Sequence, residues 1–162
     1  AVFGMHNWPW LPVGTMAVRE GAVSASTDTF KVKITGRGGH AAFPHTTIDV
    51  IVCASQMVSA LQHLVSRNVS PTDAAVLSVV MFHAGNDSPS LNVLPETAEI
   101  GGTIRTLNPD VRKMMEEKFR HVVKSVADAF GAKIDLKWQR GYPSVVNTPE
   151  ETAFARKVAE EV

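Results

Sequence analysis

The order of hydrophobic periodicities along the chain constrains its fold more than any other feature. Two stretches, 48–65 and 111–130, carry apolar residues at every third or fourth position, as one-sided helices do. Four other stretches alternate between apolar and polar residues, or stay apolar over the length of a strand: 23–35, 74–82, 97–106 and 134–138. The predicted order is therefore strand, helix, strand, strand, helix, strand.

Each predicted element has an apolar side that must be buried, and a two-layer packing achieves this. We expect an α+β fold: a β-α-β-β-α-β two-layer sandwich of the ferredoxin-like kind. Its four-stranded sheet should be mainly antiparallel, with both helices on one face. At 162 residues, the chain is long enough for one domain with a real core.

The helix ends and apolar stripes can also be predicted. Thr46 or Thr47 is expected to cap the first helix, since a side-chain oxygen there satisfies an orphan amide. Asn108 is expected to cap the second helix, and Gly131 to close it. The expected stripe of the first helix consists of Ile48, Ile51, Val52, Ser55, Val58, Leu61, Leu64 and Val65.

Composition and charge exclude several classes of protein. The 16 basic and 16 acidic residues cancel, so no global field attracts nucleic acid or an anionic membrane. No apolar run reaches the roughly 18 residues of a membrane span. The single cysteine, Cys53, excludes a disulfide framework and fits a small buried apolar residue. We therefore expect no nucleic-acid or membrane partner, and a cytoplasmic location.

His40 is the first candidate for chemistry. It follows the sequence Gly-Arg-Gly-Gly, between a predicted strand end and a predicted helix start, where loops hold functional side chains on a rigid frame. A histidine there can donate a hydrogen bond to a developing oxyanion. The same pattern also fits a solvated loop histidine. His45 is more typical of a local capping residue than of a second metal ligand.

Asn92 and Arg105 form a second candidate pair. Arg105 lies on the polar side of the predicted strand 97–106, and Asn92 precedes Val-Leu-Pro. A guanidinium offers a planar two-donor fork and an amide adds a donor, so together they can hold a substrate carboxylate. An exposed sheet arginine and a turn asparagine are the structural alternative.

His6 is a candidate metal ligand because it lies just past the apolar residues 1–4, which we expect to end a buried strand. Packing beside Trp8 and Trp10 is the alternative. The glutamate pairs of the chain are not candidates, because carboxylates on amphipathic helices meet water or favour helix starts. These pairs are 116–117, 150–151 and 160–161.

Three segments together resemble a known group of enzymes. Residues 4–9 and 11–15 resemble the end of the catalytic domain in amidohydrolases related to hippurate hydrolase and auxin-conjugate hydrolases. Residues 36–45, Gly-Arg-Gly-Gly-His-Ala-Ala-Phe-Pro-His, resemble the lid-domain signature of that group. Residues 92–95 with 102–106 resemble its second signature. The group belongs to the wider aminoacylase and zinc-carboxypeptidase superfamily.

The resemblance implies a two-domain, metal-dependent hydrolase in which the sandwich is a dimerisation (lid) domain. Residues 1–15 would end the catalytic domain, 16–142 would form the lid, and 143–162 would begin the returning catalytic segment. The amphipathic stretch 152–162 has no C-terminal stop signal, so we expect a piece of a longer chain.

The resemblance also implies roles for the candidate residues. His6 would bind metal, and His40 would reach into the active site of the partner in a homodimer and polarise the scissile carbonyl. Asn92 and Arg105 would hold the carboxylate of a small N-acyl amino acid. The reaction would be hydrolysis of the linear amide bond by metal-activated water, with a glutamate as general base.

The chain departs from the group's pattern in a way that matters for activity. It lacks the first metal motif, the catalytic Glu-Glu and the last metal-binding histidine. We therefore expect this chain to be inactive alone and to bind no metal pair, whereas the intact enzyme would use a divalent metal (Zn, Mn, Co or Ni). A free-standing ferredoxin-like binding or regulatory module is the alternative function.

Overall fold

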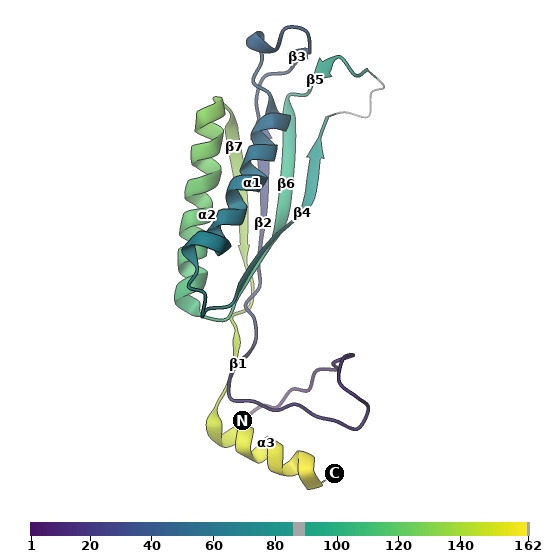
Figure 1. The fold of residues 1–162 in the computed structure, drawn as a ribbon, viewed down its shortest axis with the longest axis vertical. Helices are drawn as coiled ribbons and strands as arrows, with labels where there is room; N and C mark the ends of the chain where they lie inside the picture. Colours follow the sequence, from purple (N-terminus) through teal and green to yellow (C-terminus); the bar gives the residue numbers. More distant parts are fainter. Residues whose placement is uncertain (86–89, 162) are drawn as a thin grey trace.

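The computed structural model describes residues 1–85 and 90–161, and its main body is a two-layer sandwich (Figure 1). The sheet has the strand order β4-β6-β2-β7, and every neighbouring pair is antiparallel. This is the predicted ferredoxin-like α+β arrangement. In chain order the elements of the sandwich are β2 (Asp28–Thr35), α1 (Val50–Asn68), β4 (Ala75–Ala84), β6 (Thr97–Thr106), α2 (Pro109–Phe130) and β7 (Lys133–Arg140).

Short elements extend the sandwich at both ends, as Figure 1 shows. At one end, β3 (Gly39–His40) pairs with β5 (Val93–Leu94), next to the 3-10 turn η1 (Pro44–Thr46). We call this end, residues 36–48 and 91–96, the tip. At the other end, which we call the base, β1 (Gly21–Ser24) pairs with β8 (Val145–Asn147), and α3 (Pro149–Glu161) follows.

The core lies between the sheet and the two helices. The alternation predicted for β2 and β6 is confirmed, because Phe30, Val32 and Ile34 are buried while their neighbours in the strand face away. The Phe119 ring of α2 lies 4.4 Å from that of Phe30 and 5.2 Å from that of Trp138. These tilted and edge-on aromatic contacts join the helix layer to the sheet. The opposite face of the sheet is left open.

The start of α1 differs from the prediction. Asp49 caps the helix, since its carboxylate accepts hydrogen bonds from the amides of Ile51 and Val52. Thr46 and Thr47, the expected caps, instead donate hydroxyl hydrogen bonds within the η1 turn. The helix therefore begins later than we predicted, because the aspartate is the acceptor that lies closest to the free amides.

The predicted stripe of α1 is confirmed in its second half, where Leu61 and Leu64 are buried and Val58 and Val65 pack against the core, and it is wrong in the first turns of the helix. The buried residues are Val50, Cys53, Ala54, Met57, Leu61 and Leu64. Ile51 and Val52 remain 38% and 46% exposed. The helix is apolar over more than one face, so periodicity alone does not fix its rotation about the axis. Cys53 is fully buried, as predicted, and burial raises the pKa of its thiol, so it is no nucleophile.

The ends of α2 agree with the prediction. The Asn108 side chain accepts a hydrogen bond from the Asp110 amide at 2.9 Å. Gly131 closes the helix in the left-handed conformation, with φ of 69°, and its amide donates to the Asp128 carbonyl. A residue with a side chain would be strained at that φ, which is why glycine occupies the position.

The first predicted strand, 23–35, is divided in two. β1 ends at Ser24 and pairs with β8 outside the main sheet, whereas β2 begins at Asp28. Between them the buried Ser26 hydroxyl bonds the Thr106 hydroxyl at 2.8 Å. A buried polar side chain at an apolar position of the alternation marks the break. Residues 1–4, expected as a strand end, form no strand, because no segment of the described chain pairs with them.

The edge strand β4 carries a bulge. Its register with β6 shifts between Val79 and Met81, which leaves Val80 as an extra residue with 74% of its surface exposed. Such a bulge bends an edge strand and increases its twist. In residues 1–85 and 90–161, no helix is both long and apolar enough to cross a bilayer.

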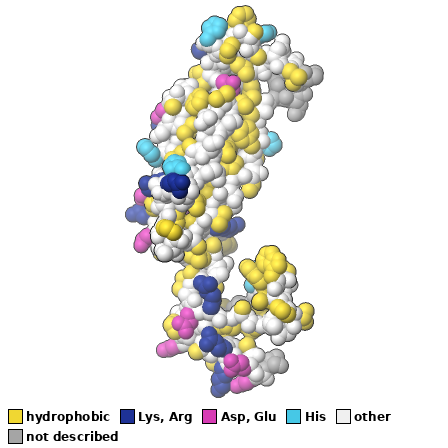
Figure 2. Space-filling model, in the orientation of Figure 1, with side chains coloured by type: hydrophobic (Ala, Val, Ile, Leu, Met, Phe, Trp, Pro, Cys, Tyr) yellow, Lys and Arg dark blue, Asp and Glu magenta, His cyan; other side chains and the backbone are white. Residues whose placement is uncertain are grey.

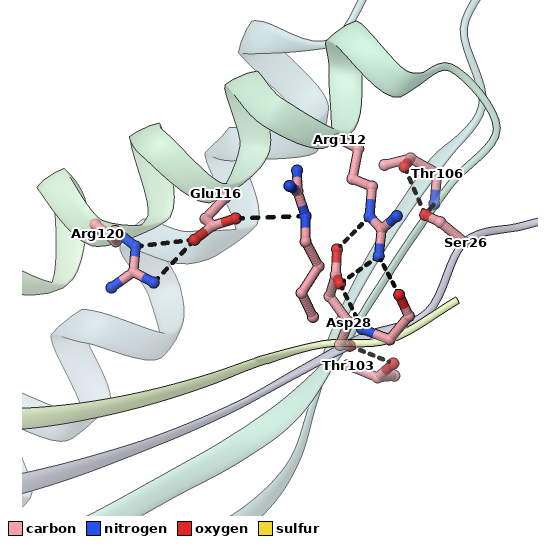
Figure 3. Close-up of polar contacts among 9 residues, drawn as sticks. Ser26, Asp28, Thr103, Thr106, Arg112, Glu116 and Arg120 are labelled. Atoms are coloured by element: carbon pink, nitrogen blue, oxygen red, sulfur yellow. Dashed lines mark hydrogen bonds and ion pairs between the residues drawn. The ribbon is translucent and has the colours of Figure 1, made fainter. Parts of the chain in front are cut away.

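A buried ion pair fastens the base of the sandwich (Figure 3). Arg112 of α2 donates to both carboxylate oxygens of Asp28 in β2, from Nε at 2.9 Å and from a terminal nitrogen at 2.7 Å. The same terminal nitrogen donates to the Gly141 carbonyl, and the Gly141 amide donates to Asp28. The cluster therefore joins the helix layer, the sheet and the segment that leaves β7.

We expect Asp28→Asn to lower the free energy of unfolding by about 3 kcal/mol, because it leaves the Arg112 charge buried without its partner. The double variant Asp28→Leu with Arg112→Met should lose much less, since it buries no charge. Urea unfolding of both variants measures the difference. Equal losses in the two variants would contradict an ionic role.

The pair should also make stability depend on pH. Burial raises the pKa of the Asp28 carboxyl, but hydrogen bonds from Arg112 and Gly141 and the charge of Arg112 outweigh it, so the net pKa is lowered. A lowered folded-state pKa stabilises the fold above the ordinary carboxyl pKa of about 3.9, and that stabilisation is lost as pH falls through the folded-state pKa. The free energy of unfolding of the Asp28→Asn variant, measured by urea unfolding across the acidic range, should therefore fall less with decreasing pH than that of the unmodified chain.

Candidate functional site

The tip is built on glycines that allow backbone segments to approach closely. A Cβ atom on Gly38 would lie 2.7 Å from the Leu94 carbonyl oxygen, and one on Gly36 would lie 2.3 Å from that of Ile48. Neither distance is possible for a real side chain, so only glycine lets this loop lie against β5 and the start of α1. The loop holds β3, and with it His40, next to Val93.

The tip brings His40 and Asn92 together, although 52 positions separate them in sequence. The Ala41 amide donates to the Asn92 carbonyl at 2.8 Å, which fixes the two backbones. The two side chains approach to 3.5 Å between the Asn92 amide and His40 Nε2. Both side chains are exposed, so a ligand can reach them.

The hydrogen bonding of His40 selects one form of its neutral ring. The Ala42 amide donates to His40 Nδ1 at 3.1 Å, so Nδ1 is an acceptor. In a neutral imidazole the proton then lies on Nε2, which becomes the donor. The Asn92 atom that lies 3.5 Å from Nε2 is its amide nitrogen, which is itself a donor, so it does not accept the Nε2 proton and leaves that proton available to a ligand. The loop therefore presents an N–H donor at its surface.

Arg105 lies at the opposite end of the four-stranded sheet from His40. It is exposed on the open face of β6, and its Cα partner is Val76 of β4. Strand β6 starts near the tip at Thr97, and the eight steps to Arg105 at about 3.3 Å each give about 26 Å. Within one chain, Arg105 and Asn92 therefore cannot hold the same small carboxylate.

His6 lies apart from both, in the exposed segment before β1. Its Nδ1 is 2.7 Å from the Asn7 carbonyl oxygen, and its ring lies 5.9 Å from that of Trp8. Donation from Nδ1 to a carbonyl leaves the Nε2 lone pair free, which is how metal-binding histidines are commonly oriented. Among residues 1–85 and 90–161, no three His, Cys, Asp or Glu side chains are grouped as a metal site.

Two features of the structure were not found from sequence. Arg112 lies on the buried side of α2, next to Val111, and nothing in the sequence distinguishes this arginine from the exposed charged residues of the same helix. Phe43 lies in the His40 loop, and its only sequence signal was a large apolar residue in a stretch of small and polar ones. The dismissed Glu116 binds Arg120 one helical turn away, which is the structural role expected of it.

Comparisons with known proteins agree on one family. Residues 26–130 match the model of the peptidase dimerisation domain. The chain is 46% identical over 147 residues to an N-acetylcysteine deacetylase of Bacillus subtilis, covering 91% of this chain and 38% of that protein. It is 40% identical over 149 residues to an N-acyl-L-amino acid amidohydrolase of Geobacillus stearothermophilus, covering 92% and 40%.

A solved structure shares the fold as well as the sequence. It is a dinuclear metal binding peptidase of the M20 family from Bacillus subtilis, with a TM-score of 0.73 and 36% identity. The match covers 98% of this chain and 38% of that one. The chain thus spans about two fifths of the length of the relatives it matches.

We expect Gly38→Ala to separate β3 from β5, because the new Cβ would meet the Leu94 oxygen at 2.7 Å and the Glu96 nitrogen at 3.2 Å. The cost should be about 1–3 kcal/mol of unfolding free energy. In NMR spectra, the proximity signal between the His40 ring and the Asn92 amide should disappear. The control Gly4→Ala, where a Cβ meets nothing within 4 Å, should change neither the free energy of unfolding nor the NMR signal between His40 and Asn92.

Proposed function

This chain belongs to the peptidase dimerisation-domain family, and from that premise we propose that it is the lid part of a metal-dependent amidohydrolase that hydrolyses N-acyl amino acids. The observation that carries the proposal is the tip, where the loop presents the His40 N–H beside Asn92 on an exposed surface. The activity in the names of the relatives, removal of acyl groups from amino acids, supports the substrate class.

The proposed division of the chain is 1–15 and 143–162 for the catalytic domain and 16–142 for the lid. Exposed hydrophobic side chains support it, because Figure 2 shows a cluster of them on the N-terminal segment in the lower part of the molecule. Residues of this segment and of α3 that expose large apolar surface include Val2, Met5, Trp8, Trp10, Val13 and Phe154. Burial of this surface in a larger domain would stabilise it.

The proposed metal chemistry belongs to the intact enzyme. His6 offers one suitably oriented nitrogen, and the described residues provide no further ligands around it. The residues present therefore do not form a complete site, and we propose that this chain binds no metal pair and is inactive alone. In the parent, a divalent metal (Zn, Mn, Co or Ni) would supply Lewis-acid chemistry. We also propose a cytoplasmic location for the parent enzyme.

The proposed partner is a second copy of the chain, bound through the outer edge of β4 and the neighbouring helix α1. β4 is an edge strand, so its outward N–H and C=O groups are open to another strand. Val76, Val80 and Phe82 on β4 are 51%, 74% and 43% exposed. The exposed Ile51 and Val52 of α1, which packs against β4, add apolar surface on the helix layer.

Antiparallel pairing of two β4 strands about a two-fold axis would set the tip of one chain beside the base of its copy. The lateral distance from one β6 to the other would be three strand spacings, or about 14 Å. Arg105 of one chain and His40 of the other would then lie on either side of a space suited to a small substrate. The proposed dimer would therefore bring an Arg105 and a His40 to one site, although the two residues of a single chain lie too far apart to share a substrate.

In this arrangement each residue has its own task. The His40 Nε2–H would donate to the carbonyl oxygen of the scissile amide and stabilise the charge that develops there. The Arg105 guanidinium would bind the substrate carboxylate through its two-donor fork. Asn92, beside His40, would add an amide contact from the same side as the imidazole. The carbonyl would thus be bound by His40 of one subunit, and the carboxylate by Arg105 of the other subunit with Asn92 adding a donor.

We expect the chain to be dimeric by light scattering, and Val80→Lys to make it monomeric. A charged side chain at the centre of the β4 edge opposes strand pairing across it. Val146→Lys on β8, a similarly exposed valine outside this edge, is the matched control and should stay dimeric. A dimer that persists in the Val80→Lys variant would exclude this interface.

Mixing two inactive variants of the intact enzyme tests the shared site. A His40→Ala chain keeps Arg105, and an Arg105→Ala chain keeps His40, so a mixed dimer has one complete site. Random exchange of subunits makes about half of the dimers mixed, so roughly a quarter of wild-type activity should return. If both residues served the site of their own chain, mixing would restore nothing.

A further inference from the structure

Phe43 has a position that the packing of the sandwich does not explain. Its side chain is 56% exposed at the tip, and it is absent from the buried core and from the residues that pack against it. A single exposed apolar residue is common on protein surfaces and by itself indicates nothing. The surroundings of Phe43, however, hold it in a defined place.

The backbone of Phe43 is fixed on both sides. Its amide donates to the His40 carbonyl at 2.9 Å, and its carbonyl accepts from the Thr46 amide at 3.0 Å and the Thr46 hydroxyl at 2.8 Å. Pro44, with its restricted φ, follows directly and begins η1. Little conformational freedom remains to be lost when a ligand binds against such a residue.

The Phe43 ring lies between two imidazoles. Its centroid is 5.7 Å from that of His40, at an interplanar angle of 55°, and 6.2 Å from that of His45. One neighbour of the His40 ring is thus an exposed phenyl group, whereas the neighbour at Nε2 is the polar Asn92 amide. The imidazole lies at a boundary between an apolar and a polar surface.

This boundary matches the two halves of an N-acyl amino acid. If His40 Nε2–H binds the carbonyl oxygen, as the proposed function has it, the acyl chain is attached to that same carbonyl carbon and lies within a few ångströms of the imidazole. The carboxylate on the other side of the amide needs donors, which Arg105 and Asn92 supply. A phenyl ring offers none, so Phe43 suits the apolar acyl side.

We propose that Phe43 is a specificity-determining residue that forms one wall of the acyl-group pocket in the partner's active site. It favours substrates with extended apolar or aromatic acyl groups over acetyl. This inference rests on the proposed function, because it needs the tip of one chain to enter the cleft of the other. Its strength comes from dispersion and aromatic contact with the acyl chain.

The test uses the intact enzyme and two substrate series. In the first series the amino acid is constant and the acyl group is acetyl, butyryl or benzoyl. In the second, the acyl group is benzoyl and the amino acid varies. We expect Phe43→Ala to lower kcat/KM about 10- to 30-fold for benzoyl substrates but less than about threefold for acetyl. Within the second series, the ranking of amino acids should not change.

A second variant and a control complete the design. Phe43→Leu should keep the preference for butyryl over acetyl and lose part of the preference for benzoyl, since it retains apolar volume without the ring. Leu91→Ala, which removes an exposed apolar side chain at the same tip, should leave the acyl preference unchanged. Circular dichroism and light scattering should show every variant folded and dimeric.

Each outcome separates the two proposals. An equal loss for all acyl groups in Phe43→Ala, or an unchanged benzoyl-to-acetyl ratio, overturns the role of Phe43 and leaves the proposed function intact. Loss of folding in Phe43→Ala, with an unchanged ratio in Phe43→Leu, also overturns it. A wild-type enzyme that hydrolyses no N-acyl amino acid overturns the proposed function itself.

Discussion

The bidentate ion pair between Arg112 and Asp28 is the interaction on which the arrangement of the molecule depends. It links α2 to the first residue of β2, and through Gly141 it links both to the segment that leaves the sheet. Moving both charges out of water costs free energy, and the two direct hydrogen bonds between Arg112 and Asp28, with those to Gly141, offset that cost. The ion pair fixes α2 and the sheet to each other at the end of the sandwich where the chain enters β2 and leaves β7.

The length of β6 determines how far apart the candidate residues lie, because they are located at its two ends. Arg105 is close to the ion pair at the base, while His40 and Asn92 lie beyond the far end of β6. A rigid sheet keeps this separation constant, which a pair of loops would not do. In the proposed dimer, each active site combines the His40 end of one subunit's sheet with the Arg105 end of the other's, so the fixed length of both sheets determines the distance between the two residues.

The sequence specified the layers well and the local boundaries less well. Alternation in β2 and β6 was unambiguous, because one face is apolar and the other is charged. The rotation of α1 was not, since Ile51 and Val52 are as apolar as the buried Val50, and only contact with the sheet decides between them. The motif around His40 identified a candidate, but its nearness to Asn92 and its distance from Arg105 depend on pairing between residues far apart in sequence. Such pairings leave no local pattern.

The bulge at Val80 and the character of β7 together bear on how many chains can associate. A strand interrupted at its centre is a poor template for an arbitrary extended peptide, so it favours a partner with the same irregularity. In the proposed dimer both β4 edges are used, and the outermost strand on each side is β7, which carries Lys133, Asp135, Lys137 and Arg140. Charged side chains along that border oppose further strand addition. Assembly of the proposed dimer would therefore be self-limiting, because the remaining edge on each side, β7, opposes the addition of another strand.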